Sequence, residues 1–226
     1  MYSIRPKLIK ALSHRDVFWS IPTAQKEIFV TFDDGPVPRV TEFVLKVLKE
    51  FDARATFFCV GDNVRKNKDI YHNIISSGHE VGNHSFHHID GWKHSVNSYC
   101  SDVELCDNFL KSKLFRPPYG RLKPSQRKIL QNKYYIIYWS LLSGDFDKKI
   151  SPEKCYQNTV SKKQINGSIV VFHDSYKTEQ KLKYALPRFL EYYSKLGYSF
   201  SAITENHCTA VGSRSRVYSG AVGSRQ

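Results

Sequence analysis

The sequence has no apolar run near the roughly 18 residues that a transmembrane helix needs. It has no Cys-x-x-Cys pair either, and its 5 cysteines are an odd number without the spacing of a disulfide framework. No secretion signal is expected in the basic N-terminal segment, because His14, Arg15 and Asp16 interrupt it before any apolar run is long enough. These absences predict a cytoplasmic protein with reduced cysteines.

Acidic residues are few relative to basic ones. The chain has 21 Asp and Glu against 34 Lys and Arg, a formal net charge of +13 at pH 7. This excess favours an acidic partner, such as nucleic acid, an anionic glycan or an anionic membrane surface. The basic residues are spread along the chain, however, without a helix-turn-helix, zinc-finger or RNP signature. We therefore expect no nucleic-acid partner, but peripheral association of the basic N-terminal segment with an anionic membrane surface.

Strand-like and helix-like patterns alternate along the chain. Short β-branched and aromatic runs occur at residues 26–32, 53–60, 80–84, 114–116, 134–140, 168–172 and 198–203. Helical patterns occur at residues 39–50, 62–76, 96–110, 124–130, 152–163 and 179–196. Repeated β–α units imply a parallel sheet with right-handed crossovers, so the sequence predicts an α/β fold with about seven parallel strands, either a barrel or an open sheet.

One domain is expected to span residues 26–206, with residues 1–25 packing on it as a basic segment. Residues 207–226 differ, because the sequence AVGSR occurs at 210–214 and again at 221–225 in a Gly/Ser/Arg-rich context. Such a composition buries too little surface to offset the entropy of ordering. We expect a disordered tail there, and truncation after Asn206 is expected to leave stability unchanged.

Polar residues gather where the predicted strands end, which is where α/β barrels assemble their active sites. The first cluster is Asp33-Asp34 within residues 31–36 (TFDDGP). Beyond a strand end adjacent side chains can diverge, so one carboxylate could bind a cation while the other acts as a base. Asp-Gly and Gly-Pro are also common in turns, and for this cluster alone a simple turn is an equal alternative.

The second cluster is the histidine group in residues 84–88 (HSFHH). Histidines four residues apart lie on one side of a helical turn, so His84 and His88 could both reach one metal ion. His87 competes with them, since a spacing of three also permits convergence. An Asp with two His leaves coordination positions free for water and substrate, as in catalytic metal sites.

Two further clusters end later strands. In residues 116–120 (RPPYG), Arg116 could pair with a carboxylate across the barrel mouth, and the prolines could fix the Tyr119 amide as an oxyanion donor. The alternative there is a polyproline-like connector. In residues 169–174 (IVVFHD), His173 ends an apolar strand, and the near-neutral pKa of histidine suits proton donation. The alternative is a strand end capped by Asp174.

All four clusters in this order resemble the motifs of the polysaccharide deacetylase family, carbohydrate esterase family 4, over roughly residues 26–204. The resemblance implies a distorted (β/α) barrel. It implies Asp33 as general base and His173 as general acid. The implied metal ligands are Asp34, His84 and His88, which leaves His87 outside the set.

The resemblance also assigns supporting roles. It implies that Arg116 orients the base and that the Tyr119 amide helps form an oxyanion hole. Val171 would form part of the pocket for the acetyl methyl group. The implied substrate pocket contains Pro118, Tyr119, Phe146 and Val171.

One motif departs from the family pattern. The family usually has D-x-x-D-W after its fifth strand, whereas residues 142–146 read LSGDF. Leu142 therefore replaces the first Asp, and Phe146 replaces the Trp. Asp145 remains, and the resemblance implies that it supports either the catalytic His or the Arg network. Phe146 can present an apolar face to a substrate but has no indole N–H.

The resemblance implies a metal-dependent hydrolase that removes acetyl groups from N-acetylated sugars. An Asp-His-His set suits Zn²⁺ first, with Co²⁺ or Ni²⁺ as alternatives. Three other functions are left open. An O-acetyl carbohydrate esterase would use the same site, a pseudoenzyme would bind sugar without hydrolysis, and a basic nucleic-acid-binding protein would owe its charge to its partner. The presence of every expected base, acid and ligand argues against the pseudoenzyme.

Overall fold

The computed structural model describes residues 17–160 and 165–210. The strands are β1 (Val17–Phe18), β2 (Glu27–Asp33), β3 (Ala55–Cys59), β4 (Glu80–Asn83), β5 (Leu114–Phe115), β6 (Tyr135–Ile137), β7 (Leu141–Leu142), β8 (Ser168–His173) and β9 (Ser199–Phe200). The α-helices are α1 (Val40–Glu50), α2 (Gly61–Lys66), α3 (Lys68–Ser76), α4 (Val96–Cys106), α5 (Pro124–Leu130), α6 (Pro152–Thr159) and α7 (Glu179–Lys195). Short 3₁₀ turns are η2 (Gly91–Lys93) and η3 (Pro118–Gly120). Within these ranges, no helix has the length and apolar character needed to cross a membrane.

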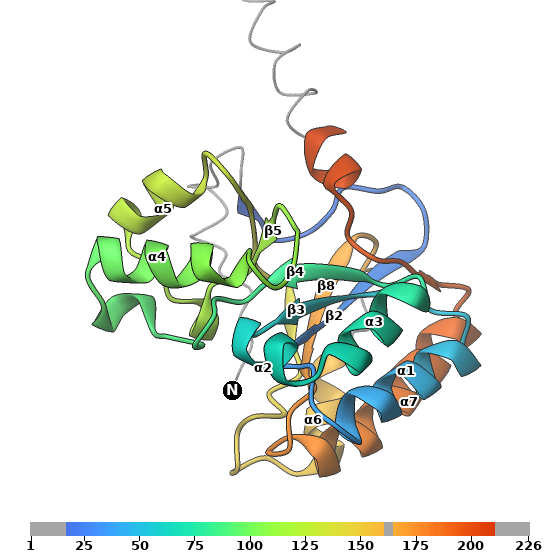
Figure 1. The fold of residues 1–226 in the computed structure, drawn as a ribbon. Coiled ribbons are helices and arrows are strands. Elements are labelled where there is room, and N and C mark those ends of the chain that lie inside the picture. Colours follow the sequence, from blue (N-terminus) through green and yellow to red (C-terminus); the bar gives the residue numbers. More distant parts are fainter. Residues whose placement is uncertain (1–16, 161–164, 211–226) are drawn as a thin grey trace, which may run out of the picture.

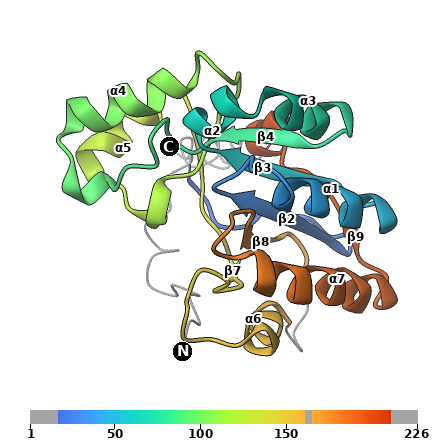
Figure 2. The same cartoon turned by 60° about the horizontal axis from the view of Figure 1, so that its bottom comes forward.

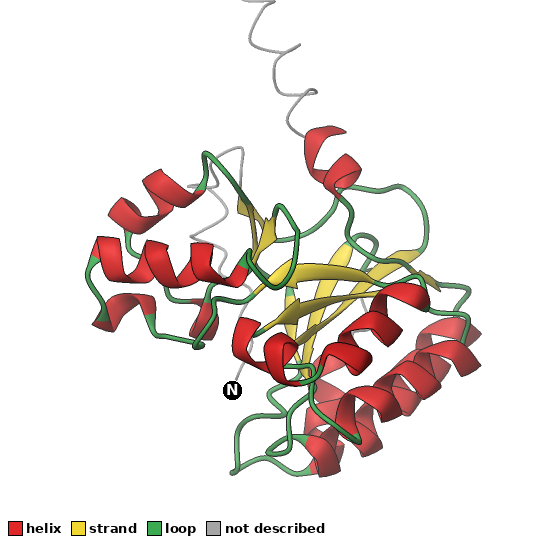
Figure 3. Ribbon diagram, in the orientation of Figure 1, coloured by secondary structure: helices red, strands yellow, loops and turns green. Residues whose placement is uncertain are grey.

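The strands form one curled parallel sheet (Figures 1 and 3). In the described residues its order is β1-β6-β5-β4-β3-β2-β8-β7, and β9 pairs with β2 outside this path. The end strands β1 and β7 are not neighbours in this order, so the described sheet does not close into a complete barrel. The expected single-domain α/β fold with a distorted barrel of parallel strands is confirmed.

The helices cover the sheet in two groups. Helices α1, α3, α6 and α7 lie together on one side of it (Figure 1). Helices α4 and α5 pack on each other and on β5 and β6, apart from the first group (Figure 2). The loops that follow the C-terminal ends of the strands are left to form the site.

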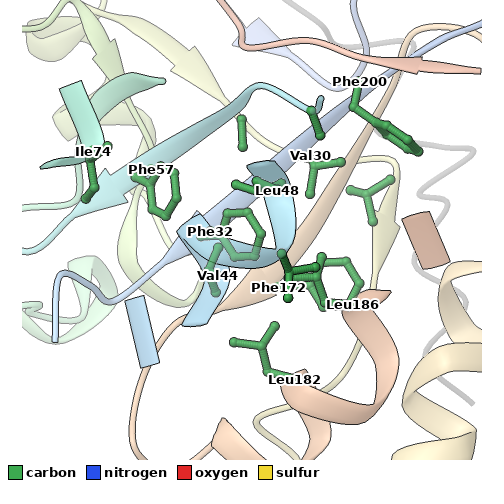
Figure 4. Packing of buried hydrophobic residues seen from close by; sticks show 14 of the residues in the cluster. Val30, Phe32, Val44, Leu48, Phe57, Ile74, Phe172, Leu182, Leu186 and Phe200 are labelled. Atoms are coloured by element: carbon green, nitrogen blue, oxygen red, sulfur yellow. The ribbon is translucent and has the colours of Figure 1, made fainter. Parts of the chain in front are cut away.

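Alternation along β2 and β8 separates the hydrophobic core from the polar site. Val30, Phe32 and Phe172 face the helices and pack in the largest apolar cluster (Figure 4). Successive side chains of a strand point to opposite faces, so Asp33 and His173 face the other way. The parallel register pairs these two residues directly across β2 and β8. Their side chains therefore meet at the ends of two neighbouring strands.

The strand expected at residues 134–140 is wrong in extent, because this segment forms β6 and then leaves the sheet before β7. Strand β6 pairs with β1 and β5, whereas β7 pairs with β8. Between them, the Arg116 guanidinium donates hydrogen bonds to the carbonyls of Ile137 (3.2 Å) and Tyr138 (3.0 Å). A buried side chain thus takes the place of a strand partner.

The helix expected at residues 62–76 is also interrupted, since α2 ends before Asn67 and α3 begins after it. Asn67 has φ −128° and ψ 54°, outside the helical region. Its side-chain amide donates to the carbonyl of Pro36 at 3.1 Å, and that of Asn63 donates to the carbonyl of Asp34 at 2.7 Å. Both helices are therefore tied to the turn that follows β2.

The disordered tail expected from residue 207 is wrong for residues 207–210. Residues 205–210 are helical, and Cys208 is buried in an apolar cluster with Phe29 and Ile203. The His207 ring lies 5.1 Å from the Phe29 ring. Residues 207–210 therefore belong to the domain, because they cover one end of its core. The rest of the expected tail, residues 211–226, and residues 1–16 of the expected basic segment lie outside the described residues.

Candidate active site

A cavity of about 740 Å³ lies at the C-terminal ends of β2 and β8. Most of the residues selected from the sequence line it, namely Asp33, Asp34, His84, His88, Tyr119, Phe146, Val171 and His173. Arg116 and Asp145 lie behind this lining and are fully buried. Pro118 is buried and is not among the residues that line the cavity, so its expected part in the pocket wall stays a prediction. Its carbonyl accepts a hydrogen bond from the Arg121 N–H at 3.1 Å, which closes the turn that carries Tyr119.

Three potential metal ligands converge at this cavity. Ligand atoms of Asp34, His84 and His88 all lie within 4.8 Å of one another. Asp34 Oδ1 is 3.1 Å from His88 Nε2 and 3.8 Å from His84 Nε2. His84 Nδ1 donates to the carbonyl of Arg116 at 2.7 Å, because a carbonyl can only accept. The lone pair of the neutral ring is therefore on Nε2, which faces Asp34.

The electrostatics of this trio suit a cation. Burial lowers the pKa of His84 to about 4, so the ring is neutral at pH 7. Burial raises the pKa of Asp34, but the adjoining His88 ring and the charge of His173 outweigh it and bring the pKa below its ordinary value. Asp34 Oδ1 is buried without a well-aligned hydrogen-bond donor among the described residues. Buried polar atoms normally have a partner, and a divalent cation would provide one here.

Residues 84–88 form an irregular loop, so the helical turn expected from the histidine spacing is wrong. Ser85 and His88 have positive φ values of 61° and 56°, as do Asp34 (80°) and Tyr119 (59°). Only six non-glycine residues in the described chain have positive φ, and these four adjoin the cavity. Each such conformation costs on the order of 1–3 kcal/mol and persists where surrounding contacts enforce it. The backbone turns, rather than helical periodicity, bring the two ligands together.

His87 lies outside the ligand set because it is bound elsewhere. Its Nδ1 is 2.5 Å from Asp102 Oδ1, and Asp102 Oδ2 accepts from the backbone N–H groups of Phe86 and His87 at 3.1 Å. The side-chain oxygen of Asn83 accepts from the Ser85 N–H at 2.8 Å. These contacts hold the histidine loop in its strained shape. Nothing in the sequence spacing indicates the roles of Asn83 and Asp102.

Asp33 and Arg116 form a buried ion pair at the mouth of the sheet. Arg116 Nη1 donates to Asp33 Oδ1 at 2.7 Å and to Thr31 Oγ1 at 2.7 Å. The guanidinium also lies 4.0 Å over the Phe58 ring. Together with its bonds to the backbone, these contacts fix the guanidinium, which in turn fixes one carboxylate oxygen of Asp33.

His173 is held by Asp145 through two contacts. Asp145 Oδ1 is 2.7 Å from His173 Nδ1, and Asp145 Oδ2 accepts from the His173 backbone N–H at 2.7 Å. Burial lowers the pKa of His173, but Asp145 outweighs burial with help from Asp34 and Asp33, and the pKa rises to about 10. The ring is therefore protonated at neutral pH. Of the two roles considered for Asp145, the contacts favour support of His173 over support of Arg116.

Asp174 has a different role from the strand cap suggested by its position. Its carboxyl group accepts from the Gly35 N–H at 3.1 Å and from the Thr41 hydroxyl at 2.6 Å. A Cβ on Gly35 would lie 2.0 Å from Asp174 Oδ2, so only glycine fits there. Burial raises the pKa of Asp174 to about 8. Contacts between residues 139 positions apart are not visible as a sequence pattern.

Several other residues line the cavity although the sequence motifs do not indicate them as pocket residues. Trp139 and Leu142 add apolar surface. Leu142 is the residue that stands where the family's D-x-x-D-W motif has its first Asp. Arg121, Lys148 and Lys177 add positive charge. Surface lysines and arginines are common throughout this basic chain, so no sequence signal separates these three from the rest.

The curled parallel sheet carries three groups of residues at one cavity: a set of possible metal ligands, a buried Asp–Arg pair and an Asp–His pair. This combination is typical of an α/β hydrolytic enzyme. Residues 20–135 match the polysaccharide deacetylase family. A peptidoglycan-N-acetylglucosamine deacetylase of Bacillus cereus is 32% identical over 201 residues, covering 84% of this chain and 92% of that protein. The chain therefore belongs to the polysaccharide deacetylase family, hydrolases of carbon–nitrogen bonds other than peptide bonds.

Two other comparisons agree with this assignment. A peptidoglycan-N-acetylmuramic acid deacetylase of Bacillus subtilis is 31% identical over 160 residues, which cover 68% of this chain and 33% of that protein. A crystal structure of a peptidoglycan N-acetylglucosamine deacetylase has a TM-score of 0.75 and 27% identity, over 83% of this chain and 91% of that one. The family resemblance expected from the motifs is confirmed.

Proposed function

We propose that this enzyme is a divalent-metal-dependent deacetylase of peptidoglycan-type glycans, which hydrolyses the acetamide of an N-acetylated amino sugar and releases acetate. The observation that carries the proposal is the convergence of Asp34, His84 and His88 on the same cavity as Asp33 and His173. The named activities of the Bacillus relatives support the same class of substrate.

Asp34, His84 and His88 would hold the metal ion. The fit rests on Asp34 Oδ1, which is buried without a well-aligned donor among the described residues, and on the Nε2 atom of His84 that faces it. One carboxylate with two imidazoles suits Zn²⁺ best, with Co²⁺ and Ni²⁺ as alternatives. When bound there, the ion would polarise the acetyl carbonyl and lower the pKa of a water molecule.

Asp33 would act as the general base. Its Oδ1 is bound by Arg116 at 2.7 Å, so the carboxylate cannot rotate freely and its other oxygen is directed by the pair. Asp33 also lines the cavity beside Asp34. It would accept the proton of the attacking water as the water adds to the acetamide carbon.

His173 would act as the general acid. The amine leaving group of an amide departs readily only when its nitrogen is protonated, so an acid is a chemical requirement. Asp145 keeps His173 protonated through neutral pH and binds its Nδ1, which leaves Nε2 for the sugar nitrogen. The Tyr119 N–H would donate to the developing oxyanion, and Val171 and Leu142 supply apolar surface for the methyl group.

An O-acetyl esterase is the main alternative, since the same groups could hydrolyse an ester. The protonated His173 favours the amide, because an alcohol leaving group needs less protonation. Acetate release should be compared between N-acetylated and O-acetylated oligosaccharides, with His173→Ala measured on both. We expect turnover of the N-acetyl substrate and a larger loss on it than on the ester. Turnover of the O-acetyl substrate alone, or of neither, would contradict the proposal.

A further inference from the structure

Two lysine side chains line the cavity, one from the loop that follows Phe146 and one from the loop that follows His173. Lys148 lies two residues after Phe146, and Lys177 lies four residues after His173. Both are exposed. Neither ammonium group has a hydrogen-bond or ion-pair partner within residues 17–160 and 165–210. Unpaired cations at the wall of a concave site concentrate anions there.

Among the described residues, the cavity lining has no acidic group that is free to neutralise these lysines. The carboxylates among the lining residues are those of Asp33 and Asp34. Asp33 is paired with Arg116 at 2.7 Å, and Asp34 belongs to the metal set. Arg121 lines the cavity as well, but Asp90 pairs with it at 2.5 Å. The unpaired positive charge of the cavity wall is therefore that of Lys148 and Lys177.

The two loops that carry these lysines are anchored to each other. Lys181, on α7, donates from its ammonium group to the carbonyls of Asp145 and Asp147. At the start of the same helix, the Thr178 hydroxyl donates to the carbonyl of His173 at 2.5 Å. Both loops are thus fixed on α7, which lowers the entropy that the loop backbone loses when an anion binds.

The role proposed for His173 limits where a charged substituent of the sugar would lie. If His173 protonates the departing nitrogen, as the proposed function requires, that nitrogen is next to the ring. In a 2-acetamido sugar the nitrogen is on C2, and the ring carbons bonded to C2 are C1 and C3. A substituent on either carbon therefore lies near the nitrogen and near His173, in the cavity that Lys148 and Lys177 also line.

We propose that Lys148 and Lys177 form a subsite for an anionic group carried on C1 or C3 of the acetylated sugar. The inference rests on the proposed function and narrows its substrate to an acidic amino sugar. The anionic group would be either a carboxylate on an O3 ether or a phosphate on C1. Both are oxyanions that lysine binds by charge-assisted hydrogen bonds.

The test uses the metal-loaded protein with the double variant Lys148→Gln/Lys177→Gln. Lys149→Gln is the matched control, because Lys149 is exposed in the same loop but does not line the cavity. Acetate release is measured on a neutral N-acetylglucosamine oligomer, on N-acetylmuramic acid with its O3 carboxylate, and on N-acetylglucosamine 1-phosphate. The double variant should raise KM for at least one anionic sugar by about tenfold and leave the neutral oligomer within about twofold. The arm that responds identifies the anion.

The subsite would be overturned if the double variant changed KM equally for neutral and anionic sugars, or if it left KM unchanged for both anionic sugars. Binding of the deacetylated products, muramic acid and glucosamine 1-phosphate, is measured in parallel by calorimetry and needs no turnover. Weaker product binding in the double variant supports the subsite, even if no sugar releases acetate and the proposed function fails. If the enzyme releases acetate but the double variant binds both products as tightly as wild type does, the subsite is overturned and the proposed function stands.

Discussion

At the scale of single residues, two adjacent carboxylates of the site have different partners. Arg116 binds Asp33, whereas Asp34 is available to a cation. Asp33 and Asp34 are adjacent in sequence, but Asp33 continues the β2 alternation while Asp34 adopts a φ of 80°. This change of backbone conformation directs the two side chains to different partners. The sequence motif predicted a division of labour, and the positive φ supplies its physical cause.

Asp33→Asn should separate catalysis from metal binding. Asparagine preserves the shape and can still accept from Arg116, but it is not a base at neutral pH. We expect metal content by elemental analysis to stay at the wild-type level while acetate release falls by roughly two orders of magnitude or more. Loss of the metal together with the activity would place Asp33 among the ligands instead.

Asp145→Asn should shift the pH profile of the enzyme. Asp145 is the main group that raises the pKa of His173 to about 10, so its removal lowers that pKa. The protonated acid is then lost at a lower pH, and the basic limb of kcat/KM moves toward neutrality. Asp69→Asn, an exposed change on α3, serves as the control. An unchanged basic limb would mean that His173 is not the acid reported by that limb.

At the scale of elements, the sequence predicted which segments are strands and helices better than where they are interrupted. The β–α alternation followed from apolar periodicity, which depends on local residues. The breaks at Asn67 and at residues 138–140 come from hydrogen bonds made by Asn67 and Arg116 to distant backbone carbonyls. The helical turn predicted for residues 84–88 fails for the same reason, since Asn83 and Asp102 determine the shape of this loop.

The turn between β2 and α1 yields a prediction on stability. Burial raises the pKa of Asp174 from the ordinary value of 3.8 to about 8 in the folded protein, so the folded state holds this proton more tightly than the unfolded chain. The resulting stabilisation is fully present below pH 3.8 and is lost as the pH rises through about 8. Asp174→Asn carries no such proton.

The stability of wild type relative to Asp174→Asn should therefore decrease between pH 5 and pH 8. Urea unfolding at these two pH values measures this difference, and Asp69→Asn again provides the control. A relative stability that is constant or that increases with pH would show that Asp174 is ionised in the fold.

At the scale of the whole molecule, the sheet places every site group at one end of neighbouring parallel strands. The motifs and their order were enough to predict this arrangement, because parallel strands bring their C-terminal ends to the same edge. The boundary of the domain was harder to predict. The four residues 207–210 show no apolar period, yet Cys208 completes an apolar cluster with residues from the N-terminal half of the chain.

Two truncations test this boundary. Removal of residues 207–226 deletes the buried Cys208 and should lower Tm by a few degrees, since apolar burial is lost. Removal of residues 211–226 alone should leave Tm and acetate release unchanged, as the composition of that segment predicts. Equal Tm values for both truncations would mean that residues 207–210 contribute nothing to the fold.

The central claim is that acetate release depends on a metal ion held by Asp34, His84 and His88. The most direct measurement is acetate release from an N-acetylated peptidoglycan fragment by protein stripped with a chelator and then titrated with Zn²⁺. We predict no release from the stripped protein and full recovery at one Zn²⁺ per chain, with no recovery in His88→Ala and normal recovery in His87→Ala. Full activity of the metal-free protein, or recovery that is lost in His87→Ala but not in His88→Ala, would contradict the account.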